Sequence, residues 1–234
     1  MKGEIFYGTS LIRFQVIHMA RKSLEIAVHP DSTVVIKAPV GTRFEEIQMR
    51  VFKRAGWIKR QLDYFRQFEP RTPPRQYIGG ETHLYLGRQY RLKINSGERD
   101  EVKLIRGYFQ IKVKKSASPD KVKSLLEAWY AEKATDRFRE SFERCWPSFE
   151  KFSLARPRMQ IRRMKKRWGS LSKNGTLTLN ADLIRAPKEC IDYVVAHELC
   201  HLQYHDHSSA FYRLMDTVMP DWKKRKHKLE LTLV

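Results

Sequence analysis

The sequence is poor in cysteine, in long apolar runs, and in acidic residues relative to basic ones. Its three cysteines, Cys145, Cys190 and Cys200, are odd in number and widely spaced, which argues against a disulfide framework and against a zinc-finger pattern. No apolar run approaches the roughly 18–20 residues that a membrane-spanning helix needs. The N-terminal residues also lack the apolar stretch of a secretory signal peptide. These absences predict a reduced, cytoplasmic location and no membrane span.

The shortage of acidic residues leaves a large positive charge. The 234 residues include 46 Lys and Arg against 26 Asp and Glu, which gives a formal net charge of +20. The excess is clustered, since residues 156–167 contain seven cations and no anion, and residues 223–228 contain five cations. Such clusters favour an anionic partner such as a nucleotide or nucleic acid. A basic surface that only aids solubility is an equally good interpretation.

Residues 1–115 are predicted to form a β-rich region with one helix. With 41% apolar and 12% aromatic residues, the chain is able to bury a core and is not disordered. The region contains a hairpin around His29–Ser32 and one helix, capped by Thr42, that carries apolar residues as far as Phe65. A proline-rich stretch predicts a connector over residues 69–74. Further strands are expected over residues 81–86, 89–94 and 102–113, and no internal repeat is visible.

Residues 116–234 are predicted to form a mixed region of helices and short strands. Ser118 and Pro119 open a long helix over residues 121–146. Alternating residues predict three strands, over residues 159–163, 168–171 and 176–180. Another helix starts at Pro187, and a further one follows residues 206–208 and ends at Pro220. The sequence therefore predicts an α+β fold with a β-rich N-terminal part, 1–115, and a helix-and-sheet catalytic part, 116–234.

The helix after Pro187 contains the pattern H-E-x-x-H, formed by His197-Glu198-Leu199-Cys200-His201. Histidines four residues apart lie on one helix face, one turn apart, so that both imidazoles can bind the same ion. Glu198 projects toward the same opening. Neutral imidazole ligands with an open fourth position suit a catalytic zinc ion, Zn2+. Cys200 points away from the histidines and is interpreted as a small buried residue.

A third zinc ligand is expected from the residues after the motif, where His205 and His207 compete. Residues eight apart on a straight helix are separated by about 12 Å. Nitrogen ligands on one tetrahedral zinc lie only about 3.5 Å apart, so His205 cannot join His197 and His201. The helix must end and the chain must turn back, which favours His207. Asp206 is a weaker rival, and either Asp206 or Ser208 can cap the next helix.

Several segments together resemble the YgjP-like family of metal-dependent hydrolases, which is grouped with the zincin metallopeptidases and is similar to SprT and WLM proteins. The resemblance is carried by Trp168-Gly169-Ser170, Leu179 to Leu183, Tyr193 to Leu202, and His207-Ser208 with Phe211-Tyr212. Weaker matches extend it over nearly the whole chain. It implies a zincin-like catalytic part, zinc held by His197, His201 and His207, and Glu198 as the catalytic base. Tyr204 stands where metzincins carry glycine.

The leading hypothesis is a zinc-dependent metallopeptidase that hydrolyses a peptide or protein. Residues 176–180 are a candidate edge strand for binding an extended peptide, although an ordinary sheet strand is as good an interpretation. No residue is identified that stabilises the oxyanion, because Tyr193, Tyr204, Tyr212 and Arg213 are interpreted as structural. Trp168 is interpreted as a packed aromatic residue rather than a wall of the substrate site, and Gly169 as a backbone bend.

Two other functions fit the same residues. The first is a nucleoside triphosphate pyrophosphohydrolase, in which a cluster of cations binds the phosphates: Arg162, Arg163, Lys165, Lys166 and Arg167. The second is a nucleic-acid-binding module or nucleic-acid-associated protease, as the similarity to SprT suggests. The sequence lacks a recognised helix-turn-helix or zinc-finger pattern, which counts against this last function.

Overall fold

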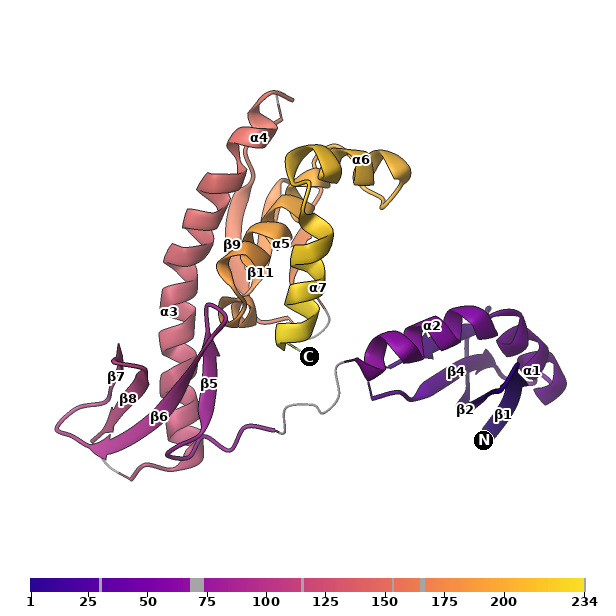
Figure 1. The fold of residues 1–234 in the computed structure, drawn as a ribbon, viewed down its shortest axis with the longest axis horizontal. Helices are drawn as coiled ribbons and strands as arrows, with labels where there is room; N and C mark the ends of the chain where they lie inside the picture. Colours follow the sequence, from indigo (N-terminus) through magenta and orange to yellow (C-terminus); the bar gives the residue numbers. More distant parts are fainter. Residues whose placement is uncertain (30, 68–73, 115, 153, 165–166, 234) are drawn as a thin grey trace. The chain divides into compact units, whose positions relative to one another are not determined.

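The computed structural model describes residues 1–29, 31–67, 74–114, 116–152, 154–164 and 167–233 (Figure 1). It divides the chain into compact units at residue 73, and each unit has its own hydrophobic core. The division therefore lies earlier than the boundary at residue 115 expected from the sequence. The sheet formed by residues 82–113 shares its core with the helices that follow it. Pro30 and most of the predicted connector, residues 68–73, lie outside the described residues.

The N-terminal unit contains a four-stranded sheet. Its strands are β1 (Lys2–Tyr7), β2 (Ser10–Met19), β3 (Glu25–Val28) and β4 (Val34–Pro39). Their order is β1-β2-β4-β3, with β2 and β4 parallel and both outer pairs antiparallel. Along β2, Ile12, Phe14 and Val16 are buried and alternate with exposed residues, as expected for a sheet with one covered face. The predicted hairpin between β3 and β4 is confirmed.

Two helices, α1 (Phe44–Lys53) and α2 (Ala55–Arg66), replace the single helix that the sequence predicts. The chain breaks at Arg54, and the buried residues continue at intervals of three or four across the break: Ile47, Val51, Ala55 and Ile58. Because the apolar stripe is uninterrupted, periodicity cannot reveal the break. The predicted cap is also wrong, since the Thr42 hydroxyl donates to the Pro39 carbonyl, 2.9 Å away, and Arg43 occupies the cap position.

The second unit begins with a sheet of the same topology. Its strands are β5 (Thr82–Tyr85), β6 (Arg88–Ser96), β7 (Glu101–Ile105) and β8 (Tyr108–Val113), in the order β5-β6-β8-β7. Again a parallel central pair lies between two antiparallel hairpins. The predicted strands are confirmed. The structure adds a repeat of topology that is not visible as a repeat of sequence, because different apolar residues satisfy the same alternating pattern.

The long helix α3 (Pro119–Cys145) connects the two sheets of this unit. Ser118 caps it, with its hydroxyl accepting from the Lys121 backbone N–H. Figure 1 shows α3 passing β5–β8 near its start and β9 and α5 further along. Near its start, the Tyr130 hydroxyl donates to the Leu84 carbonyl at 2.7 Å, and Trp129 packs edge-on against Phe109. A short helix, α4 (Pro147–Glu150), follows it.

A three-stranded sheet lies beside the H-E-x-x-H helix. Its strands are β9 (Arg158–Arg162), β10 (Gly169–Leu171) and β11 (Thr176–Asn180), in the order β10-β11-β9. The expectation that residues 176–180 form an edge strand is therefore wrong. β11 is central because β9 pairs with it in parallel after the chain crosses over, and such a long-range pairing leaves no local signal in the sequence.

Helix α5 (Lys188–Cys200) packs against this sheet, and two further helices, α6 (Ser209–Val218) and α7 (Trp222–Leu233), pack against α5. A 3-10 turn, η1 (Ala181–Arg185), leads into α5, which carries the motif, and α6 follows. The last helix, α7, was not predicted and contains the second cluster of cations. The predicted α+β class is confirmed. No helix among the described residues is both long and apolar enough to cross a membrane.

Candidate metal centre

Helix α5 is anchored to α3 by a polar cluster around Asp192. The Ser141 hydroxyl, which is fully buried, donates to the Asp192 carboxylate at 2.6 Å, and the Arg144 guanidinium donates to it at 2.7 Å. The Cys145 thiol lies 3.5 Å from the Asp192 carbonyl. Partnered polar groups in a buried region hold two elements in one register, because breaking them leaves groups unsatisfied. The cluster therefore fixes the turn of α5 that precedes the motif.

The helix ends at His201, as the ligand-spacing argument requires. His201 is the C-cap residue of α5, and the Tyr204 N–H donates to the Cys200 carbonyl at 3.0 Å to form the following turn. The chain then returns, so that His207 comes before the N-cap residue of α6, Ser208. The Ser208 side chain forms no capping hydrogen bond, so its expected role as a side-chain cap is not realised.

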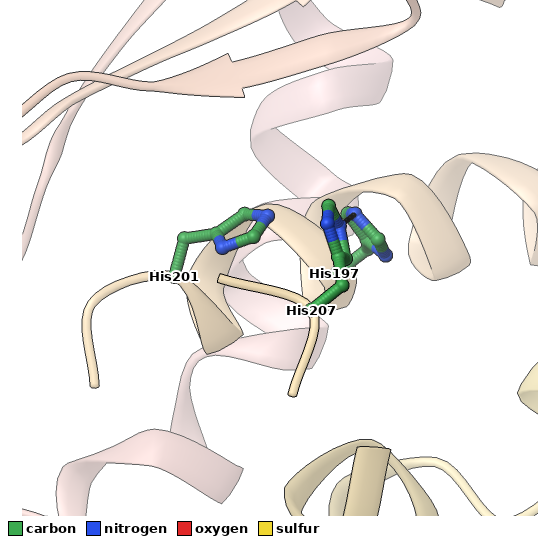
Figure 2. A group of neighbouring side chains, drawn as sticks. All are labelled: His197, His201 and His207. Carbon is green, nitrogen blue, oxygen red and sulfur yellow. Dashed lines mark hydrogen bonds between the residues drawn. The ribbon is translucent and has the colours of Figure 1, made fainter. Parts of the chain in front are cut away.

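The turn brings three imidazoles together. One ring nitrogen from each of His197, His201 and His207 lies within 4.8 Å of the other two. The Nε2 atoms of His197 and His207 are 3.0 Å apart. In Figure 2 the ring of His201 lies opposite the rings of His197 and His207 across a common space. These separations are close to the roughly 3.5 Å between ligands on a tetrahedral zinc, so the three residues fit a single metal ion.

Two contacts orient the imidazoles. The His201 Nδ1 atom lies 2.9 Å from the Tyr204 carbonyl, and a proton donated there leaves Nε2 free as a ligand atom. The ring of Phe211, fully buried on α6, lies 4.7–5.0 Å by centroid from all three histidine rings. Phe211 was expected only as an apolar residue of its helix. The structure places its ring in contact with all three histidine rings.

Burial favours the neutral form of two of the histidines, His197 and His201. Burial, followed by the charges of His201 and His207, lowers the pKa of His197 to about 3. Burial also lowers the pKa of His201, although its bond to the Tyr204 carbonyl acts in the opposite direction. Neutral imidazole is the form that binds a metal ion, so the site is prepared for a cation at neutral pH.

Glu198 lies beside strand β10 and is only 7% exposed. Burial raises the pKa of its carboxyl to about 7, against the effects of the Arg167 charge and the Leu171 backbone amide. A Cβ atom at Gly169 would lie 2.6 Å from the Glu198 Cγ atom and 2.8 Å from its Oε1 atom. Gly169 was interpreted as a backbone bend, but it lies within a strand. Its lack of a side chain makes room for the glutamate.

Replacing Gly169 with alanine is expected to displace the Glu198 carboxylate and to lower about 100-fold the kcat of any reaction in which this carboxylate takes part. A misplacement of about 1 Å at a reacting group costs an enzyme roughly that factor. Metal binding by the three histidines is expected to stay unchanged, because the new methyl group meets Glu198 first. Ser170→Ala is the matched control, since side chains alternate along a strand. An unchanged kcat in Gly169→Ala would contradict the prediction.

The other residues near the motif do not join the cluster. His205 and Asp206 are exposed in the turn between α5 and α6, and among the described residues the metal-binding group contains neither of them. Cys200 is fully buried, with its sulfur 3.3 Å from that of Met215, as its predicted packing role requires.

The tyrosines near the motif form part of an aromatic stack with Trp222, the first residue of α7. Tyr193 and Tyr212 both stack on the Trp222 ring, with centroids 6.4 and 5.5 Å away. Tyr212 is 40% exposed, and its ring lies 6.3 Å from that of His207. Three of the four residues considered for stabilising the oxyanion lie beside the histidine cluster. The Tyr193 ring is beside that of His197, the Tyr212 ring is beside that of His207, and the Tyr204 carbonyl is beside the His201 Nδ1 atom. The Trp222 contact was not foreseen, because α7 shows no clear apolar periodicity.

The free edge of the small sheet faces the site. The Trp168 carbonyl accepts from the Asn180 N–H on β11, and the Ser172 N–H donates to the Thr176 carbonyl. Backbone groups of successive residues point to alternate sides of a strand. Those of Gly169 and Leu171 are therefore directed away from β11. Strand β10, rather than β11, is the strand beside Glu198 that an extended chain could join.

The cations expected to bind a nucleotide are only partly available. The Arg163 guanidinium is 3.0 Å from the Glu127 carboxylate, whereas Arg167 is exposed and close enough to Glu198 to affect its pKa. Lys165 and Lys166 lie outside the described residues. The described part of the cluster therefore offers less free charge than the sequence indicates.

Comparison with known proteins identifies relatives of this chain. No curated protein sequence matches it. The crystal structure of the metallopeptidase zymogen abylysin from Pyrococcus abyssi is 26% identical, covers 41% of this chain and 94% of its own, and has a TM-score of 0.37. That of the metallopeptidase zymogen jannalysin from Methanocaldococcus jannaschii is 19% identical, covers 42% and 90%, and has the same TM-score.

A model of the YgjP-like family, described as a metallopeptidase domain, matches residues 22–232. This range includes the three histidines, Glu198 and strand β10. Since the match extends over most of the 234 residues, the chain belongs to the YgjP-like metallopeptidase family.

Proposed function

We propose that the protein is a zinc-dependent peptidase in which His197, His201 and His207 hold the metal and Glu198 is the catalytic base. The observation that carries the proposal is the convergence of three imidazoles within 4.8 Å of one another, beside a buried glutamate that directly follows His197. Three nitrogen ligands and no fourth among the described residues are typical of a catalytic zinc rather than a structural one.

The residues around the cluster divide the chemistry among them. His197, His201 and His207 would hold the zinc ion, which would supply Lewis acidity for a water molecule and for the carbonyl of the scissile bond. The Glu198 carboxylate accepts the proton from the attacking water and passes it to the leaving nitrogen. Gly169 allows the carboxylate to approach, and burial excludes competing solvent from it.

The free edge of β10 supports a peptide as the substrate. Backbone groups of Gly169 and the Leu171 carbonyl point away from β11, whereas the Leu171 N–H acts on the proposed base, which Gly169 also contacts. An extended peptide that adds to this edge forms main-chain hydrogen bonds and brings one of its carbonyls beside Glu198. Binding through the main chain is independent of the side chains of the peptide, so selectivity must come from neighbouring surfaces.

Metal analysis and peptide cleavage test the proposal. We expect about one zinc per chain, loss of peptide cleavage after chelation, and recovery when zinc is restored. Zinc added at about 100 times its Kd should stabilise the metal-free protein by about 2.7 kcal/mol, measured from the melting temperature. Pyrophosphate release from nucleoside triphosphates, without cleavage of any peptide, would contradict the proposal. So would a stoichiometric metal with no hydrolysis of either substrate class.

A further inference from the structure

A cavity of about 510 Å³ adjoins the small sheet, between the end of β9 and the start of β10. The residues that matter for its chemistry are three arginines, one carboxylate, one amide and one aromatic residue: Arg163, Arg167, Arg185, Asp182, Asn180 and Trp168. The charged groups of the lining are three guanidinium groups and one carboxylate, so the lining carries more positive than negative charge. The proposed hydrolytic mechanism uses none of these side chains.

Two of the three arginines are already neutralised. The Arg163 guanidinium pairs with Glu127 at 3.0 Å and with Asp182 at 3.6 Å. The Arg185 guanidinium pairs with Asp182 at 2.7 Å. Among residues 1–164 and 167–233, as far as they are described, none forms an ion pair with Arg167. Arg167 is thus the cation of the cavity that is free to bind a ligand.

Asn180 holds the described backbone at Met164 and at Arg167. Asn180, only 3% exposed, donates through its side-chain amide to the carbonyls of Met164 and Arg167, at 2.7 and 3.0 Å. Its side-chain oxygen accepts from the Met164 N–H at 3.3 Å and from the Asp182 N–H at 3.2 Å. One buried side chain thereby ties both sides of the loop between β9 and β10 to β11. A fixed backbone lowers the entropy lost when the arginine binds a partner.

Arg167 also lies on the path of the peptide proposed above. It precedes Gly169 by two residues, which in extended backbone corresponds to about 7 Å along the strand. Gly169 is in direct contact with Glu198, so Arg167 enters the strand two residues before the position beside the proposed base. A side chain of a peptide bound along β10, two residues from the one opposite Gly169, is therefore within reach of Arg167.

We propose that Arg167 is a specificity-determining residue that binds a carboxylate side chain of the peptide lying along β10. This inference rests on the proposed peptidase function and adds the substrate class, peptides with an acidic residue near the cleaved bond. A single free guanidinium matches the single negative charge of a carboxylate, which it binds through paired hydrogen bonds. A nucleoside triphosphate carries several negative charges and would need several free cations, which the described residues of the cavity do not offer.

Equilibrium binding tests the inference without requiring turnover. The protein is the full chain with Glu198→Gln, and the probes are fluorescein-labelled peptides that carry either Glu or Gln at one position and are otherwise identical. Fluorescence anisotropy at low salt measures their affinities. We expect the Glu peptide to bind about 10-fold more tightly, as for an accessible charge-assisted pair. Adding Arg167→Gln should remove the difference between the peptides. Adding Arg158→Gln, the same charge change at the opposite end of β9, should preserve it.

Three outcomes would overturn the inference. They are equal affinities for the two peptides, a preference for Glu that survives Arg167→Gln, and binding of ATP that depends on Arg167 without any preference for the Glu peptide. Cleavage of the two peptides by the wild type distinguishes failure of this inference from failure of the proposed peptidase function. If the wild type cleaves Glu and Gln peptides equally well, the peptidase stands and the inference falls. If it cleaves neither but the Glu preference depends on Arg167, the inference about the cavity stands.

Discussion

Replacement of Glu198 by glutamine is expected to lower kcat for peptide hydrolysis by about 10²–10⁴-fold, the usual contribution of a positioned general base. Glutamine has nearly the same shape, so it fits the space beside Gly169 while losing the ability to accept a proton. The three histidines are unaffected, so the zinc content should equal that of the wild type. Steady-state kinetics on a cleaved peptide, together with metal analysis of the same preparation, measures both quantities.

The control for Glu198→Gln is a substitution of a carboxylate with no contact to the site. Asp120, at the start of α3, is exposed, and Asp120→Asn should leave both kcat and zinc content unchanged. Retention of full activity by Glu198→Gln would exclude the glutamate as the base. Loss of zinc together with activity would mean that the glutamate acts through the metal site rather than on the proton.

Replacing His207 with alanine is expected to abolish stoichiometric zinc binding and, with it, peptide cleavage. The ring of His207 lies within 5.0 Å by centroid of both other histidine rings, and its Nε2 atom is 3.0 Å from that of His197. Loss of a partner outside the ligand shell already weakens metal binding about 10–100-fold, so loss of a ligand should weaken it by at least about 100-fold. Competition with a coloured zinc chelator measures the affinity directly.

His205 provides the matched control, since it is a histidine two residues earlier in the same turn and is exposed outside the cluster. His205→Ala should retain wild-type zinc affinity and activity. If His205→Ala lost the metal and His207→Ala retained it, the assignment of the third ligand would be wrong. Equal losses in both variants would indicate that the turn, rather than one imidazole, is what the substitutions disturb.

His207 shows how much of the site can be predicted from the spacing of residues along the sequence. Eight residues of straight helix are too long to bring His205 onto the ion, so the sequence already required the helix to stop and the chain to return. The structure ends α5 at Cys200 and brings His207 to the other imidazoles. The proximity of His207 to the other two imidazoles could be predicted because the constraint is local and geometric, involving only the rise of a helix and the separation of ligands on one ion.

The order of the strands in the small sheet could not be predicted from spacing along the sequence. The sequence located all three strands of the small sheet, yet it left open whether residues 176–180 form an edge strand or an ordinary one, and they form the central strand β11. Strand order depends on the parallel pairing of β9 with β11, and parallel partners must be joined by a long crossover. Gly169 was misinterpreted for the same reason, because its contact is with Glu198, which lies 29 residues later in the sequence.

The sequence by itself determined the α+β class, most of the helices and strands, the pair of histidines with their glutamate, and the family resemblance. These follow from periodicity, capping and the geometry of one helix, all of which act over a few residues. Only the tertiary structure decided which strand borders the site, which residue makes room for Glu198, and which arginine of the cavity forms no ion pair with the described residues. Those features arise from contacts between segments far apart in the chain, and a pattern of neighbouring residues carries no record of them.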